Sequence, residues 1–137
     1  MDMNPRLEAY DDGYAYVLPL TEEHAQQLDM MDWKFVDTVH SALIAIAKGR
    51  ARKPMDNTDV SHSSKLLEYA EGLRAEILIR AVADGMSYGH AARAMDVERS
   101  TAQGRVEAAQ KKWHRQWLIP AAQRDYENCP ECKEVQE

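Results

Sequence analysis

The side chains best placed for chemistry lie in residues 80–113, where the sequence predicts a short helix, a turn and a second helix. The exposed start of the second helix combines an acid, an arginine, a serine and a glutamine. Arginine can pair with guanine through two hydrogen bonds, glutamine can pair with adenine likewise, and glutamate accepts from the amino group of cytosine. We therefore expect contacts to DNA bases from these residues: Glu98, Arg99, Ser100 and Gln103.

A second set of hydroxyl and cationic side chains surrounds that helix. Phosphate oxygens accept hydrogen bonds and attract cations, and such contacts fix the position of a protein on the duplex. Each single cation could equally be an ordinary solvated surface charge, so the cluster is more informative than its members. The residues expected to contact phosphates are Ser87, Tyr88 and Arg93 from the first helix, and Arg105, Lys111 and Lys112 from the second.

Small and apolar residues predict how these two helices pack. Ser87 is a good N-cap for the first helix, and Asp96 tolerates the left-handed backbone of a tight turn. Ala92 and Ala102 are small enough to let the helices cross closely. Together these features predict a helix-turn-helix. The positions expected to face the core are Ala91, Ala92, Met95, Val97, Ala102, Val106, Ala109 and Trp113.

The same residues resemble the helix-turn-helix of sigma-factor region 4 and of sigma-like regulators, including phage late-transcription regulators. The family pattern is roughly Asp-Gly-x-Ser-Tyr-x-x-Ile-Ala-x-x-Leu-Gly-Val-Ser-x-Ser-Thr-Val-x-x-Arg-Val. The resemblance covers about 40 residues that end at Trp113, and it implies a DNA-binding transcription regulator of bacterial or phage type. The matching positions are Asp84, Gly85, Ser87, Tyr88, Ala92, Val97, Ser100, Thr101, Arg105 and Val106.

The chain departs from the family pattern at three positions. Asp96 replaces the turn glycine, Glu98 replaces a serine, and Ala102 replaces a valine. Glu98 matters most, because it places an acid where phosphate usually approaches a helix N-terminus. It should repel the DNA backbone unless it accepts a hydrogen bond from cytosine. The alternative is a motif that serves packing or protein contacts without touching DNA.

Two cysteines near the end of the chain, Cys129 and Cys132, have the spacing of half a tetrahedral zinc site. No second pair of cysteines supplies the other half, although a site shared across a dimer is conceivable. The alternative is a tail with two reduced thiols. Apart from such a zinc ion, no cofactor is expected.

An enzyme is not expected. The sequence has no glycine-rich phosphate loop, no His-Glu-x-x-His motif and no nucleophile elbow. The five histidines are scattered, and no spacing singles out a pair of carboxylates. The catalytic residues expected are therefore none.

The net charge of −6 excludes a uniformly basic nucleic-acid coat protein. The charge is uneven: residues 1–47 hold nine acids and two bases, whereas residues 85–116 hold six bases and three acids. This suggests one face for a polyanion and another for a different partner, although the charges could simply solvate helix surfaces. The paired thiols and the lack of an N-terminal signal or a spanning segment predict a cytoplasmic protein without membrane contact.

The periodicity predicts an all-α fold with a short N-terminal extended arm or hairpin over residues 1–20. A long amphipathic helix for interaction or dimerisation is expected over 21–49, followed by a linker over 50–64. The helix-turn-helix domain spans 65–119, and its first helix is capped by Ser63 or Ser64. An acidic tail with the cysteine pair occupies 120–137. The apolar stripe expected on that first helix is Leu66, Ala70, Leu73, Ile77 and Ala81, with Leu67, Leu78 and Val82 beside it.

These observations predict a homodimeric regulator that binds double-stranded DNA, with residues 21–48 as the candidate contact for RNA polymerase. A single helix-turn-helix makes few base contacts, so useful specificity requires a second copy or a partner. Two alternatives stay open. One is an interaction module that inhibits polymerase or another regulator without DNA contact. The other is a subunit like a phage small terminase, which recognises DNA and assembles into rings.

Overall fold

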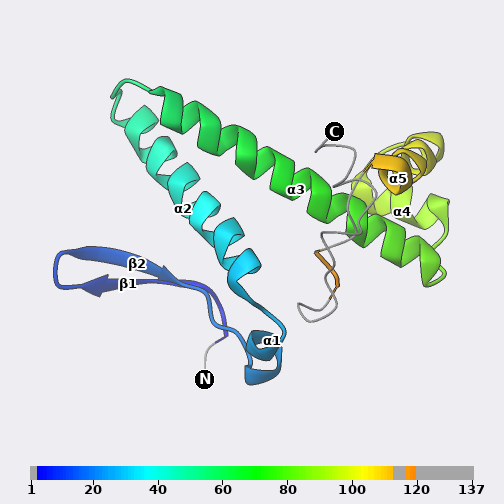
Figure 1. The fold of residues 1–137 in the computed structure, drawn as a ribbon, viewed down its shortest axis with the longest axis horizontal. Coiled ribbons are helices and arrows are strands. Elements are labelled where there is room, and N and C mark those ends of the chain that lie inside the picture. Colours follow the sequence, from blue (N-terminus) through cyan, green and yellow to red (C-terminus); the bar gives the residue numbers. More distant parts are fainter. Residues whose placement is uncertain (1–2, 113–116, 120–137) are drawn as a thin grey trace, which may run out of the picture.

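The computed structural model describes residues 3–112 and 117–119, and the described chain is mostly helical with one small sheet (Figure 1). It therefore agrees with the expected helical fold, and the N-terminal segment is a two-stranded hairpin. The elements are β1 (Arg6–Tyr10), β2 (Gly13–Val17), α1 (Glu22–Gln26), α2 (Met30–Arg50), α3 (Asn57–Ala83), α4 (Tyr88–Met95) and α5 (Arg99–Lys112).

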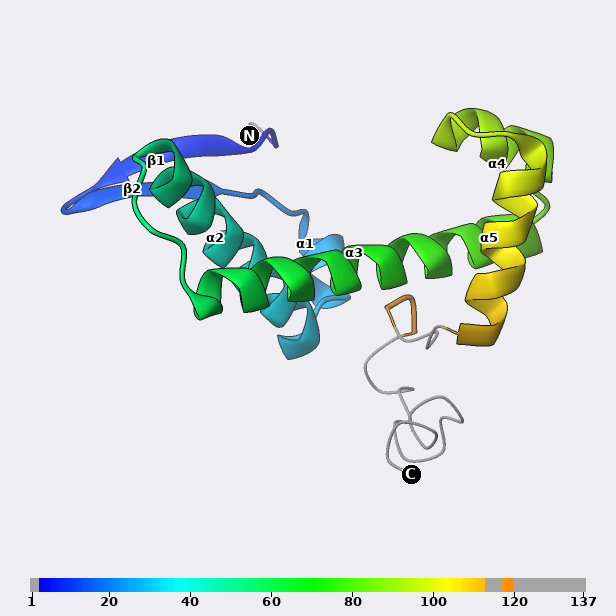
Figure 2. The same cartoon turned by 90° about the horizontal axis from the view of Figure 1, so that it is seen from above.

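The long helix α3 organises the molecule. Helix α2 packs against its N-terminal part as one arm of a helical hairpin, while α4 and α5 pack at its C-terminal end (Figure 1). Figure 2 shows α5 crossing α3 steeply at that end. The β-hairpin projects at the opposite end of the long axis in both views. The two ends of the molecule are thus connected mainly through α3.

The buried core of the described residues lies at the α4–α5 end. Its hydrophobic members are mostly alanines, and Ala102 and Val106 are fully buried. Val97 and Met95 are half-buried against it. The sequence prediction for the inward faces of α4 and α5 is confirmed at every described position. The core consists of Ala75, Leu78, Ile79, Ala91, Ala92, Ala102, Val106 and Ala109.

The single long helix predicted over 21–49 is wrong. Thr21 does cap a helix, since its hydroxyl accepts from the backbone N–H of His24, but that helix ends at Gln26. A new helix begins at Met30, where the carboxylate of Asp32 accepts from the backbone N–H of Asp29 at 2.9 Å. Aspartate side chains compete with helical hydrogen bonds in this way, so they favour helix starts over helix interiors.

The predicted linker over 50–64 is also too long, because α3 begins at Asn57. Its N-cap is Asp56 and neither Ser63 nor Ser64. The carboxylate of Asp56 accepts from the backbone N–H of Asp59 at 2.9 Å, and the carboxylate of Asp59 accepts from the backbone N–H of Asp56 at 3.0 Å. This reciprocal capping box satisfies two backbone donors and starts the helix about two turns earlier than the serines would.

The apolar stripe predicted on α3 is partly wrong. Ile77 is 49% exposed, whereas Leu78 and Ile79 are buried. The buried face follows α4 and α5, which pack on a different side of α3 from the one that the leucine spacing indicated. That face also includes Glu76, which is only 3% exposed.

Glu76 is buried because it binds the backbone of a later segment. The N–H of Trp117 donates to Glu76 Oε2 at 2.9 Å, and the N–H of Leu118 donates to Glu76 Oε1 at 3.4 Å. Trp117 also meets the rings of Phe35 and Tyr69 edge-to-face, with centroids 5.5 and 5.7 Å away. These contacts attach residues 117–119 to both α2 and α3. Trp117 is therefore a packing residue, while Trp113 lies outside the described residues.

A cluster of charged side chains joins the end of α2 to the start of α3. Lys48 donates a hydrogen bond to the carboxylate of Asp59 and lies 3.5 Å from the carboxylate of Asp56. The Lys48 hydrogen bond, with help from the backbone of Asp56, holds the pKa of Asp59 below its usual value. The pKa of Lys48 is raised, chiefly by the same bond to Asp59.

This cluster predicts a loss of stability in acid. Because the pKa of Asp59 is lowered on folding, its contribution is present above the ordinary aspartate pKa of about 4 and is lost as the pH falls through the lowered value. Asp59→Asn keeps an acceptor for the cap and should remove this dependence. Thermal unfolding at pH 7, 5 and 3 should show that wild type is more stable than the variant at pH 7. This difference in stability should shrink by pH 3. A difference independent of pH would contradict the assignment.

Glu76 gives a second stability prediction. Replacing it by alanine leaves the N–H groups of Trp117 and Leu118 without their acceptor and should cost about 1–3 kcal/mol. Glu71→Ala removes an exposed carboxylate from the same helix and should stay within about 0.5 kcal/mol of wild type. Chemical denaturation monitored by circular dichroism measures both. Equal effects of the two substitutions would show that Glu76 is not a structural acceptor.

Candidate nucleic-acid interface

The end of α3 fixes the start of α4. Gly85 has φ +112°, a backbone conformation that residues other than glycine rarely adopt. The backbone N–H of Met86 donates to the carbonyl of Ala81 at 2.9 Å, and the N–H of Gly85 donates to that of Val82 at 3.1 Å. These two bonds form a Schellman motif that reverses the chain. Ser87 then caps α4, as predicted, by accepting from the N–H of His90 at 3.1 Å.

The same device ends α4. Asp96 adopts the left-handed conformation, with φ 55° and ψ 49°, as the sequence predicts. The N–H of Val97 donates to the carbonyl of Ala92 at 3.0 Å, and the N–H of Asp96 donates to that of Arg93 at 3.3 Å. Val97 then packs against the core, and α5 begins at Arg99. The geometry of this turn fixes the direction in which α5 leaves α4.

The N-terminal part of α5 is open on the side away from the core. Its inner stripe is fully or almost fully buried, whereas Glu98, Arg99 and Ser100 are exposed and Gln103 is half-buried. Because successive helical residues are about 100° apart, Arg99 and Gln103 share one flank of α5, while Ser100 and Lys111 lie opposite the core. Arg105 lies on the other flank. The predicted base contacts therefore cover adjoining sectors of one helix.

Two contacts hold side chains of this surface. The Arg99 guanidinium lies 6.0 Å from the ring centroid of Tyr88, which is itself half-buried against the core. The amide of Gln103 donates to the carboxylate of Glu107 at 3.0 Å. Sequence reasoning missed this partner of Gln103, although the spacing of four residues is the signal for such a pair.

The cations of this surface have no acidic partner in the part of the chain that the structure describes. Within the described residues, the salt bridges join other groups, and no carboxylate pairs with Arg93, Arg99, Arg105 or Lys111. All four side chains are exposed. The hydroxyl of Ser87 accepts a cap bond and keeps its own hydrogen for donation. Side chains from both helices can therefore bind phosphate groups.

The structure does not describe three of the predicted site groups: the side chain of Lys112 and both cysteines, Cys129 and Cys132. Among the described residues, no group of three or more histidine, cysteine or acidic side chains could hold a metal ion. The basic segment over 48–53 lies at the other end of α3 from α5 (Figure 1), where Lys48 is engaged by Asp59.

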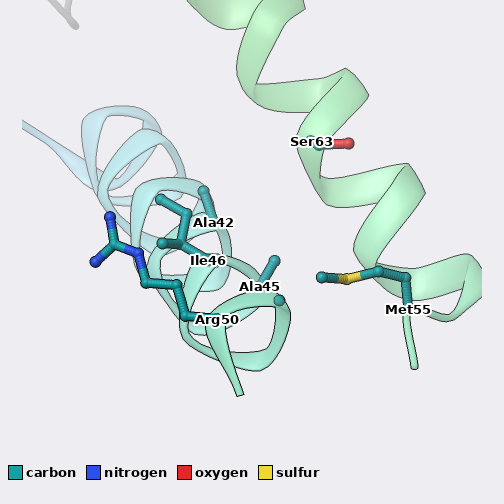
Figure 3. Close-up of a pocket in the computed structure, with 7 residues that line it drawn as sticks. Ala42, Ala45, Ile46, Arg50, Met55 and Ser63 are labelled. Carbon is teal, nitrogen blue, oxygen red and sulfur yellow. The ribbon is translucent and has the colours of Figure 1, made fainter. Parts of the chain in front are cut away.

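A groove between α2 and the start of α3 carries little chemistry. Figure 3 shows Met55 reaching toward α2, while Arg50 points away from α3. Its walls offer one hydroxyl, one guanidinium and no carboxylate, so no catalytic set is present there. The lining residues are Ala42, Ala45, Ile46, Gly49, Arg50, Met55 and Ser63.

Comparisons with models of protein families, with curated proteins and with solved structures found no match. Among the described helices, none combines the length and apolar character needed to cross a lipid bilayer.

The turn before α5 gives a testable stability effect. Because Asp96 pays a steric cost for its positive φ, Asp96→Gly should stabilise the protein by about 0.5–1 kcal/mol. Arg52 has a similar φ of 57° at the end of α2, so Arg52→Gly is a matched control with the same expected gain. Thermal unfolding measures both. A loss of stability for Asp96→Gly alone would mean that the Asp96 side chain itself supports the turn.

Proposed function

We propose that the protein is a regulator that binds duplex DNA, with α4 and α5 forming a helix-turn-helix and α5 entering the major groove. The observation that supports this most directly is the open N-terminal part of α5, together with four exposed cations on α4 and α5 that have no carboxylate partner among the described residues. A recognition helix needs such an exposed start, because it contacts bases with its first turns.

Base recognition is assigned to the first two turns of α5. Arg99 and Gln103 share a flank one turn apart, so they can meet neighbouring base pairs. Tyr88 limits the freedom of the Arg99 side chain, and Glu107 limits that of Gln103. Side chains held in this way lose less conformational entropy on binding. Ser100, on the side of α5 opposite the core, faces the major groove beside them.

Glu98 adds a directional constraint. It is exposed immediately before α5 and would repel a phosphate placed there. The same carboxylate accepts a hydrogen bond from the amino group of cytosine. We therefore propose that Glu98 disfavours sites in which the backbone runs close to the helix start and favours cytosine at the base pair it faces.

Phosphate binding is assigned to groups on either side of the recognition helix. Helix α4 contributes Tyr88 and Arg93, together with its cap Ser87. Helix α5 contributes Arg105 and Lys111, which lie beyond its first two turns. Contacts from two helices would fix the angle of α5 in the groove. The acidic segment of α1 and the start of α2 is the proposed contact for a protein partner, either RNA polymerase or a second copy of the chain.

Binding to random and genomic duplex fragments, titrated with salt, tests the proposal. Wild type should bind with an affinity that falls steeply as salt rises. Loss of a bidentate pair in Arg99→Ala or Gln103→Ala should weaken binding to a selected site by about 1–3 kcal/mol, whereas Arg105→Ala should weaken all sequences alike and reduce the salt slope by about one.

Lys34→Ala is the matched control, because it removes an exposed cation from α2 without touching α5. It should leave site preference unchanged. Unchanged preference in the Arg99→Ala/Gln103→Ala double variant would refute the base-reading roles. No binding at low salt would instead favour the interaction-module alternative. A ring of many copies in solution would favour the alternative that resembles a small terminase.

A further inference from the structure

Apolar surface is distributed very unevenly along the described chain. All eight buried hydrophobic residues lie between Ala75 and Ala109, whereas sixteen of the eighteen exposed large hydrophobic residues lie between Met3 and Leu67. A contiguous apolar patch left exposed on a folded protein marks an interaction site. The N-terminal half therefore exposes the material of a core without having a core of its own.

Part of this surface forms a regular seam along the outer face of α2. The seam residues are separated by three, four, three and four positions, which is the heptad spacing of helices that pair side by side. The seam contains no aspartate, glutamate, lysine or arginine, and it lies nearly opposite the side that faces α3, where Phe35, Thr38 and Ala42 pack. Trp33 is 61% exposed and Leu43 is 41% exposed. The seam consists of Trp33, Val36, His40, Leu43 and Ala47, with Ile44 beside it.

We propose that this seam binds the seam of a second copy of the same chain, with the two α2 helices antiparallel across a two-fold axis. This inference is independent of the proposed DNA contact. The charges around α2 select the orientation. Acids gather near its start, including Glu22, Glu23 and Asp37, and the cations Arg50, Arg52 and Lys53 gather at its end. An antiparallel pair places each acidic end on the partner's basic end, whereas a parallel pair would superpose like charges.

The heptad register then predicts the contacts. In an antiparallel pair, Val36 of one copy lies opposite Ala47 of the other, and His40 lies opposite Leu43. At the layer of Val36 and Ala47, a larger side chain therefore meets a smaller one. It also sets Trp33 opposite Arg50. The Arg50 guanidinium is directed away from α3 (Figure 3), and no carboxylate among the described residues pairs with it. A guanidinium over an indole face is a favourable contact.

A stable pair needs a large interface, about 800 Å² per partner. The seam from Trp33 to Ala47 spans two heptads of α2. The β-hairpin supplies a further apolar face, because Leu7 pairs with Tyr16 and Ala9 with Tyr14 on the same side of the strands. Leu7, Tyr14 and Tyr16 are each more than half exposed. An isolated two-stranded hairpin is only marginally stable, so cover by the second copy would stabilise it.

Light scattering of the full chain at tens of micromolar tests the inference. Wild type should have about twice the 15.6 kDa of one chain. Leu43→Glu/Ile44→Glu should give a monomer, because it buries two carboxylates per protomer in the seam. Both residues are at least 41% exposed, so the monomer should keep its helix content by circular dichroism. Ile77→Glu, at 49% exposure on α3, is the matched control and should remain a dimer.

Orientation is tested by disulfide trapping in a Cys129→Ser/Cys132→Ser background. Val36→Cys/Ala47→Cys should form an interchain disulfide under mild oxidation, and Val36→Cys alone should not, because only a parallel pair brings two copies of residue 36 together. A monomeric wild type, a seam variant that stays dimeric, or trapping by Val36→Cys alone would each overturn the proposed pairing.

Discussion

Close packing of alanine side chains among α3, α4 and α5 is the constraint on which the rest of the structure depends. Alanine contributes little apolar area, so these helices must approach closely to exclude water from the core. Close approach allows few relative positions, and the left-handed turns at Gly85 and Asp96 select among them. A larger side chain at Ala92 or Ala102 would separate α4 from α5 and would displace the exposed start of α5. The surface that α5 presents is thus set by residues that never reach it.

Glu76 connects this small core to the other half of the molecule. Its buried carboxylate is stabilised by backbone N–H donors from Trp117 and Leu118, and the Trp117 ring then reaches Phe35 on α2. Burying a charged or polar group is unfavourable unless its hydrogen bonds are satisfied. The position of residues 117–119 is therefore part of the folded state of α3, and α2 is held at both ends: by the aromatic rings at its start and by Lys48 at its end.

Local features with a direct physical cause were predictable from the sequence, and features decided by distant contacts were not. The cap at Ser87, the left-handed turn at Asp96 and the buried stripe of α5 follow from residue types and spacing alone. The start of α3 was misplaced because Asp56 and Asp59 cap each other, a local alternative that outweighs two good serine caps. The buried face of α3 was misjudged because leucine spacing does not show which side α4 and α5 will occupy. Glu76 could not be recognised, since its partners are about 40 residues away.

The negative total charge does not argue against an anionic ligand at α5. In both views the β-hairpin, with Asp11 and Asp12 at its turn, lies at the opposite end of the long axis from α5 (Figures 1 and 2). Helix α3 alone is about 40 Å long by its 1.5 Å rise per residue, whereas charges at physiological salt are screened over about 8 Å. A phosphate at α5 therefore responds to Arg93, Arg99, Arg105 and the nearby Glu98 and Glu107 far more than to acids of the hairpin. The local charge of a surface decides its ligand, and the total charge of the chain does not.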